Sequence, residues 1–153
     1  LEQLEAQNIS PKVYEMFKKI KPEAIEFRPV EQFDLVSEVN APAESNFWLK
    51  SNEATPFEMP MQHQLLAYIS DYGLLRTATL PHRKELSKGT TFFASLDHAL
   101  WFHRDFSFDQ WLLYSADSPS ASNSRGFSRG SIFDRNGLLI ASVAQEGLIK
   151  QKL

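Results

Sequence analysis

Residues 61–75, which read MQHQLLAYISDYGLL, carry a strong helical pattern. They contain no proline, and Pro60 suits a first helical turn, where its missing N–H would be unpaired in any case. At about 100° per residue the apolar side chains cover almost the whole circumference, which predicts a helix buried on nearly all sides. Its one charge, Asp71, is then expected to be paired, protonated or functional, unless it reaches solvent near the C-terminal end of the helix.

Strand patterns precede and follow this helix. Residues 24–30 (AIEFRPV) alternate apolar and charged positions up to a proline, which is typical of an edge strand. Residues 47–50 form a short strand candidate, and the polar stretch 81–89 is predicted to be a loop. Residues 90–104, which are rich in aromatic and β-compatible residues, are predicted to form a strand. Further strands are predicted over 111–116, 125–134 and 138–149.

The order of these elements indicates the fold class. Asn136-Gly137 lies between two strand segments and predicts a hairpin with a type I′ turn. Two strands, one long buried helix and about four antiparallel strands make an α+β architecture. A curved antiparallel sheet of five or six strands wrapped around one helix is the hot-dog arrangement, and we expect it here.

Length and composition fit one globular domain. The chain has 153 residues, of which 42% are hydrophobic and 23% charged. Residues 1–23 are predicted to be a leading helix or linker, with Ser10-Pro11 at a helix start, and residues 24–153 to be the folded domain. Because the chain begins with Leu1 rather than methionine, we expect it to be a fragment or a processed piece of a longer protein.

Charge and cysteine content exclude several functions. The net charge of −3 shows no basic excess that would favour nucleic acid or an anionic membrane surface. The absence of cysteine excludes disulfides, a thiolate zinc site and a cysteine nucleophile. No apolar run is long enough to span a membrane, and no signal-peptide pattern opens the chain. The spacing of His82, His98 and His103 matches no metal-ligand motif, so no metal is expected.

Strand alternation identifies candidate polar residues. Gln145 shares a predicted face with Ala141, Val143 and Ile149, so its amide is expected to point toward the helix. It is either a structural amide that bonds to the backbone or a site residue. Ser95 is predicted on one face of segment 90–104. It either donates to a carboxylate or holds a water, or it is an ordinary strand serine. His98 on the opposite face is either a base or a structural hydrogen-bonding residue.

Two arginines could serve an anionic ligand. Arg125 and Arg129 are predicted to face the same way as Phe127, where they could meet phosphate groups. The alternative is a solvated strand face. The neighbouring Gly126 and Gly130 form no phosphate-loop pattern, so a nucleotide-binding loop is not implied.

Seven segments carry a family resemblance. They are 25–31 (IEFRPVE), 47–52 (FWLKSN), 63–71 (HQLLAYISD), 95–104 (SLDHALWFHR), 111–115 (WLLYS), 118–130 (SPSASNSRGFSRG) and 143–147 (VAQEG). In this order and spacing they resemble the type II acyl-CoA thioesterases, the bacterial enzymes and their peroxisomal relatives.

The resemblance implies hydrolysis of fatty acyl-CoA to free fatty acid and CoA, with no cofactor and no covalent intermediate. By motif position it implies that Asp71, Ser95 and Gln145 hold the attacking water. The family carries two hot-dog repeats in one polypeptide, and this chain resembles only the second. We therefore expect the N-terminal repeat or another copy of the chain as partner, and a homo-oligomer in the latter case.

Rival functions and the location follow from a few residues. The alternatives to a thioesterase are a hot-dog dehydratase of hydroxyacyl thioesters, with His98 as base, and a non-catalytic acyl-CoA-binding or interaction domain. The ending Gln151-Lys152-Leu153 resembles the peroxisomal Ser-Lys-Leu signal, with Gln in place of Ser. This predicts a peroxisomal location, or otherwise a cytoplasmic one.

Overall fold

In the described part of the chain, an antiparallel sheet of seven strands forms one layer. The computed structural model describes residues 25–30, 37–52 and 58–152. The strand order is β1-β2-β5-β6-β7-β3, and β4 pairs with β7 further along the same edge as β3. The elements are β1 (Ile25–Pro29), β2 (Glu44–Ser51), α3 (Met59–Ser70), α4 (Leu74–Thr77), the 3₁₀ turn η1 (Leu80–His82), α5 (Arg83–Leu86), β3 (Thr90–Ser95), β4 (Ala99–Phe102), β5 (Leu112–Ser122), β6 (Arg125–Phe133) and β7 (Leu139–Lys152).

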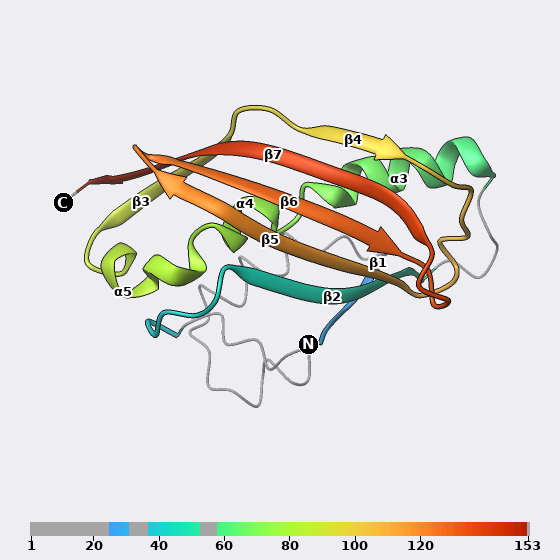
Figure 1. The fold of residues 1–153 in the computed structure, drawn as a ribbon, viewed down its shortest axis with the longest axis horizontal. Helices are drawn as coiled ribbons and strands as arrows, with labels where there is room; N and C mark the ends of the chain where they lie inside the picture. The colour runs from blue at the N-terminus through green and yellow to red at the C-terminus, as the bar shows by residue number, and fades with distance from the viewer. Residues whose placement is uncertain (1–24, 31–36, 53–57, 153) are drawn as a thin grey trace.

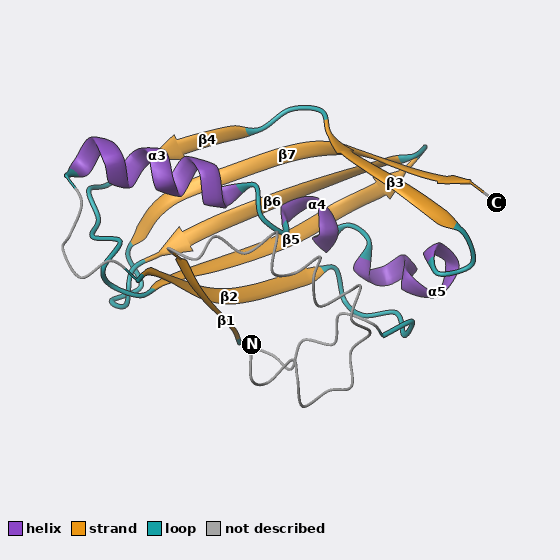
Figure 2. Cartoon of the chain, turned by 180° about the vertical axis from the view of Figure 1, so that it is seen from behind, coloured by secondary structure: helices purple, strands orange, loops and turns teal. Residues whose placement is uncertain are grey.

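The helices lie on one face of the sheet, which curves around them (Figures 1 and 2). The core fills the space between: Leu66 and Ile69 of α3 and Tyr114 of β5 are fully buried. Alternate residues of β5 and β6 point into this core, as the period-two burial pattern of both strands shows. This is the predicted α+β arrangement, with β1 at one edge as expected and more strands than predicted.

Two glycines allow close packing on the inner face of the sheet. A Cβ atom on Gly130 would overlap with the Tyr114 ring, and one on Gly147 would overlap with Leu75 at the start of α4. Both strands therefore need glycine at these positions on their inner faces.

The prediction of one helix over residues 61–75 is wrong at its C-terminal end. The helix α3 ends at Ser70, Asp71 is its C-cap, and Gly73 then adopts φ +77° before the short helix α4. Glycine reaches this left-handed conformation without a steric penalty, which is why the chain turns there. The prediction of nearly complete burial is also wrong, because Tyr68 remains 59% exposed.

The segment 90–104 is two strands rather than one. Between β3 and β4 the Asp97 carboxylate accepts the N–H of Glu146 on β7, which replaces a ladder hydrogen bond. Ser95 pairs with Gly147 and Ala99 with Ala144, so the alternation changes phase across the break. Ser95 and His98, predicted on opposite faces, therefore both point toward the end of α3.

The hairpin turns from β5 to β6 and from β6 to β7 both depart from what the sequence pattern indicates. The hairpin from β6 to β7 is confirmed, but only Gly137 has a positive φ within the Asn136-Gly137 pair, so the turn is not type I′. The side chain of Asp134 accepts the N–H groups of Asn136 and Leu138 and organises a longer loop. The hairpin from β5 to β6 instead has positive φ at both Asn123 and Ser124, within a serine-rich stretch that we did not predict to be a strand.

Other predictions concern segments near the helices and the termini. The stretch 81–89, predicted to be a loop, contains most of η1 and all of α5. The leading segment 1–23 and Leu153 of the predicted peroxisomal signal lie outside the described residues. Both remain predictions. Among the described residues, no helix has the length and apolar character needed to cross a membrane.

Candidate functional site

Asp71 lies where α3 ends, on the wall of a groove. The preceding residue, Ser70, is fully buried, and its carbonyl oxygen accepts the Tyr114 hydroxyl at 2.7 Å. This bond joins the end of the helix to the middle of the sheet. The Asp71 side chain itself is 53% exposed. Of the alternatives for Asp71, exposure near the C-terminal end of the helix is the one observed: the helix has already ended, and the carboxylate reaches the groove.

The structure brings the other two predicted residues to this carboxylate. Ser95, the last residue of β3, donates its hydroxyl to Asp71 Oδ1 at 3.2 Å. Gln145 of β7 donates its amide N–H groups to Ser95 Oγ at 2.8 Å and to Asp71 Oδ1. Two donors thus converge on one carboxylate oxygen, and they fix the orientation of the side chain.

Gln145 occupies the inner face of β7, as its strand pattern predicted, and is 1% exposed. Its amide nitrogen faces Asp71 because an ionised carboxylate can only accept hydrogen bonds. In the described part of the chain, Gln145 Oε1 has no hydrogen-bond partner. The same holds for the buried hydroxyl of Ser128, the residue directly opposite Gln145 on β6. The contact with Asp71 and Ser95 therefore determines which way the amide points.

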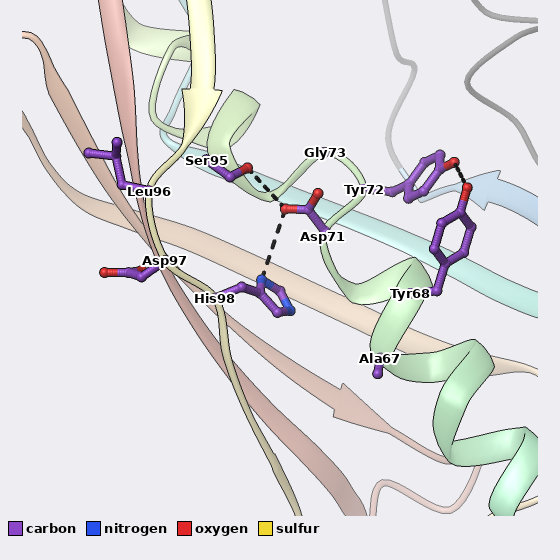
Figure 3. Close-up of a pocket in the computed structure, with 9 residues that line it drawn as sticks. All are labelled: Ala67, Tyr68, Asp71, Tyr72, Gly73, Ser95, Leu96, Asp97 and His98. Carbon is purple, nitrogen blue, oxygen red and sulfur yellow. Dashed lines mark hydrogen bonds and ion pairs between the residues drawn. The ribbon is translucent and has the colours of Figure 1, made fainter.

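His98 reaches the same place from the break between β3 and β4. Its Nε2 lies 2.8 Å from Ser70 Oγ, and its Nδ1 lies 4.0 Å from Asp71 Oδ1. Figure 3 shows Asp71 between Ser95 and His98, whereas Asp97 points away from the carboxylate. One ring nitrogen of His98 thus contacts the end of α3, and the other faces the Asp71 carboxylate.

A groove of about 800 Å³ opens in front of these residues. Two tyrosines from α3 and the turn after it stand on its far side, with their hydroxyl oxygens 2.8 Å apart (Figure 3). Burial, the hydrogen bond from Tyr68 and the nearby charges of Tyr68 and Asp71 raise the pKa of Tyr72 to about 12. The Tyr72 hydroxyl is therefore neutral at physiological pH. The lining residues are Ala67, Tyr68, Asp71, Tyr72, Gly73, Ser95, Leu96, Asp97 and His98.

Arg125 and Arg129 lie on the opposite face of the sheet. Gly126 between them faces α4, where an added Cβ would meet Ala78, so the flanking arginines point outward. Arg129 donates its Nε and Nη2 hydrogens to the two carboxylate oxygens of Asp117, and Arg125 Nη1 lies 2.6 Å from Glu146 Oε2. The structure does not bring them to Asp71. Their contact with phosphate groups stays a prediction.

Histidines and carboxylates do not gather into a metal site in the described part of the chain. No group of three or more such side chains is placed there to hold an ion. His98 lies beside Asp71, whereas His103 bonds to Ser142 at 2.8 Å on a strand of the sheet.

A sequence model of the family described as "Acyl-CoA thioesterase" matches residues 28–148, which is most of the chain. The chain belongs to the acyl-CoA thioesterase family. It is 42% identical to acyl-CoA thioesterase 2 of Haemophilus influenzae over 71% of this chain and 38% of that protein. It is 38% identical to human acyl-coenzyme A thioesterase 8 over 84% of this chain and 40% of that protein. The chain thus spans about two fifths of the length of these relatives.

Solved structures confirm the hot-dog fold for this acyl-CoA thioesterase family member. An acyl-CoA thioesterase II from Mycobacterium marinum superimposes with a TM-score of 0.72 and 37% identity, over 85% of this chain and 50% of that one. A hot-dog protein from Alicyclobacillus acidocaldarius superimposes with a TM-score of 0.65 at 18% identity, which supports the fold alone.

Sequence reasoning missed several groove residues of this family member. Tyr68 and Tyr72 lie in the segment 61–75 and count there among the side chains that predict a buried helix. A tyrosine pair four residues apart is nevertheless a signal for neighbouring hydroxyls on one helix side. Ser70 and Tyr114 were not singled out. Their link depends on the packing of β5 against the end of α3, for which the sequence carries no local signal.

Proposed function

We propose that this chain supplies an acyl-CoA hydrolase site that converts fatty acyl-CoA and water into a free fatty acid and CoA. The observation that carries the proposal is the Asp71 carboxylate, held by Ser95 and Gln145 at the wall of the groove. Family membership supports it, although the chain spans only part of its named relatives.

In this proposal Asp71 acts as general base. Water attacks a thioester slowly at neutral pH, and a positioned carboxylate that takes a proton from it contributes about 10²–10⁴-fold. Ser95 and Gln145 hold the carboxylate in one orientation, so little rearrangement is needed when the water attacks. As the C–O bond forms, one proton passes to Asp71. When the C–S bond breaks, that proton goes to the departing sulfur.

Release of free thiol from acyl-CoA substrates of increasing chain length tests this function. The 153-residue chain is expected to release CoA thiol from at least one chain length. Loss of water from hydroxyacyl-CoA without thiol release would instead support the dehydratase, and binding without reaction would support a non-catalytic domain. Both results would contradict our proposal.

Replacing Ser95 by Ala is expected to lower kcat about 10–100-fold, because it removes one hydrogen bond to the charged carboxylate while Gln145 still holds it. Thiol-release kinetics and a thermal unfolding curve would check this. Ser131 to Ala on β6 is a suitable control, because that residue faces the opposite side of the sheet. A Ser95→Ala protein with unchanged kcat would contradict the role of Ser95.

We further propose that a second hot-dog unit covers the β3 and β4 edge. Within the described residues this edge pairs with β7 on one side only. Large apolar side chains are exposed along it: Phe92 is 59% exposed and Trp101 52% exposed. Open strand edges with apolar side chains favour association. In the absence of an N-terminal repeat, another copy of the chain is the proposed partner.

Sedimentation of the chain at micromolar concentration is expected to give a dimer or larger species. Phe92→Lys should shift it toward monomer, because lysine on an edge strand opposes pairing. Leu138→Lys is the matched control, since Leu138 is 50% exposed but lies in the loop before β7. A wild-type chain that sediments as a monomer would contradict this proposal.

A further inference from the structure

The hydroxyl of Ser70 determines how His98 is protonated. A serine hydroxyl has one hydrogen, and Ser70 Oγ donates it to the Ala67 carbonyl oxygen at 2.9 Å. With the hydroxyl hydrogen directed to Ala67, the serine oxygen acts as the acceptor in its 2.8 Å contact with His98 Nε2. His98 Nε2 then carries the ring hydrogen. In the neutral ring Nδ1 is left with an unshared electron pair.

That electron pair faces the proposed base. His98 Nδ1 lies 4.0 Å from Asp71 Oδ1, so two hydrogen-bond acceptors stand opposite each other. One water between them can serve both acceptors, because a water molecule has two hydrogens to donate. A water that donates one hydrogen to each, at the usual distance of about 2.8 Å, places its two acceptors about 4.0–4.5 Å apart. The observed separation lies in this range.

We propose that His98 is a further residue of the water site, whose Nδ1 accepts the second hydrogen of the attacking water while Asp71 accepts the first. This rests on the proposed function. With both hydrogens held, a lone pair of the water oxygen points into the groove, where the thioester carbonyl would lie. The water hydrogen that points to Asp71 is transferred to the carboxylate during the attack and later passes to the departing sulfur. The hydrogen toward His98 stays on the oxygen, so His98 orients the water and takes no proton.

Two amide variants separate the contact with the water from the contact with Ser70. The amide nitrogen of His98→Gln can replace Nε2 and keep the bond to Ser70, but no acceptor remains near the position of Nδ1. The shorter side chain of His98→Asn can place its oxygen near that position, and it loses Ser70. His98→Gln is expected to lower kcat about 10-fold with KM unchanged, whereas His98→Asn should stay within about 3-fold of the wild type. The reverse order would show that His98 acts through Ser70 and would overturn the proposal.

The protonation of the ring gives a readout that does not depend on activity. Long-range ¹H–¹⁵N spectra of the wild-type chain at neutral pH should show His98 with Nε2 protonated and Nδ1 unprotonated. The chain has four histidines, and the signals missing in His98→Gln assign those of His98. A ring protonated at Nδ1, or at both nitrogens, would overturn the inference, because the hydrogen toward Asp71 would then belong to His98.

Replacing Ser70 by Ala tests the same link from the other side. Without the serine oxygen, the neutral His98 ring can carry its hydrogen on either nitrogen. The Ser70→Ala single variant should therefore have a kcat about 3–10-fold below that of the wild type. Adding Ser70→Ala to the His98→Gln variant should not lower kcat further, because glutamine leaves no acceptor at the position of Nδ1 that Ser70 could orient. If the two losses in kcat were additive, the proposal would be contradicted.

A wild-type chain that releases no thiol would refute the proposed function, whereas an active wild type with a fully active His98→Gln variant would refute only the inference about His98.

Discussion

Asp71→Asn is expected to lower kcat for thioester hydrolysis by about 10²–10⁴-fold, with the folded structure intact. Asparagine has the shape of aspartate, and its oxygen can still accept the hydrogen bonds from Ser95 and Gln145. Its amide cannot take a proton from water at neutral pH, so only the basic function is removed. Thiol-release kinetics would measure the loss, and circular dichroism with a thermal unfolding curve would show that folding is preserved.

Asp117→Asn makes the same chemical change on the opposite side of the sheet. Asp117 pairs with Arg129 on the face of the sheet away from the helices, and the pair is exposed. Exposed ion pairs contribute little to stability, so this variant should remain within about 2-fold of wild-type kcat. An Asp71→Asn protein with undiminished thiol release would refute the role of Asp71 as base. Equal losses in both variants would show that the effect is not specific to the groove.

Gly130→Ala should cause a large loss of stability. An added Cβ would overlap with Cε2 of Tyr114 and lie 3.0 Å from its hydroxyl oxygen. Tyr114 is fully buried and bound to Ser70, so it cannot move aside without breaking that bond. Overpacking of this kind costs about 3 kcal/mol, which corresponds to a decrease in Tm of about 6–12 °C for a chain of this size. Thermal and denaturant unfolding would measure it.

Gly137→Asn provides the control for this prediction. Gly137 has φ +80° and no atom within 4 Å of an added Cβ, so its substitution tests backbone strain without overpacking. Asparagine tolerates this conformation better than other side chains, and the variant should lose less than about 1 kcal/mol. If Gly130→Ala were as stable as Gly137→Asn, the close contact between β6 and Tyr114 would not hold in solution.

Local patterns were sufficient for much of the sheet. The alternation around Gln145 predicted its inward direction because side chains along a strand alternate between faces, whatever the strand pairs with. The edge strand β1 followed from its alternating charges and Pro29 in the same way. Patterns failed where one residue interrupts an element. Gly73 lies at the turn where the helix is interrupted. Asp97 interrupts the edge strand, because its carboxylate accepts the backbone N–H of Glu146 on the neighbouring strand β7.

The sequence by itself determined the α+β class, the inward amide of Gln145 and, through its resemblance to a family, the three residues of the candidate site. Only the tertiary structure decided that Asp71 is half exposed, that His98 faces it, and that Arg125 points away from it. The physical reason is distance along the chain. Asp71 meets Ser95 and Gln145 only because α3, β3 and β7 pack together, and strand register and close packing at Gly130 determine how they do so. Periodicity describes the faces of one element and carries no information on which element lies opposite.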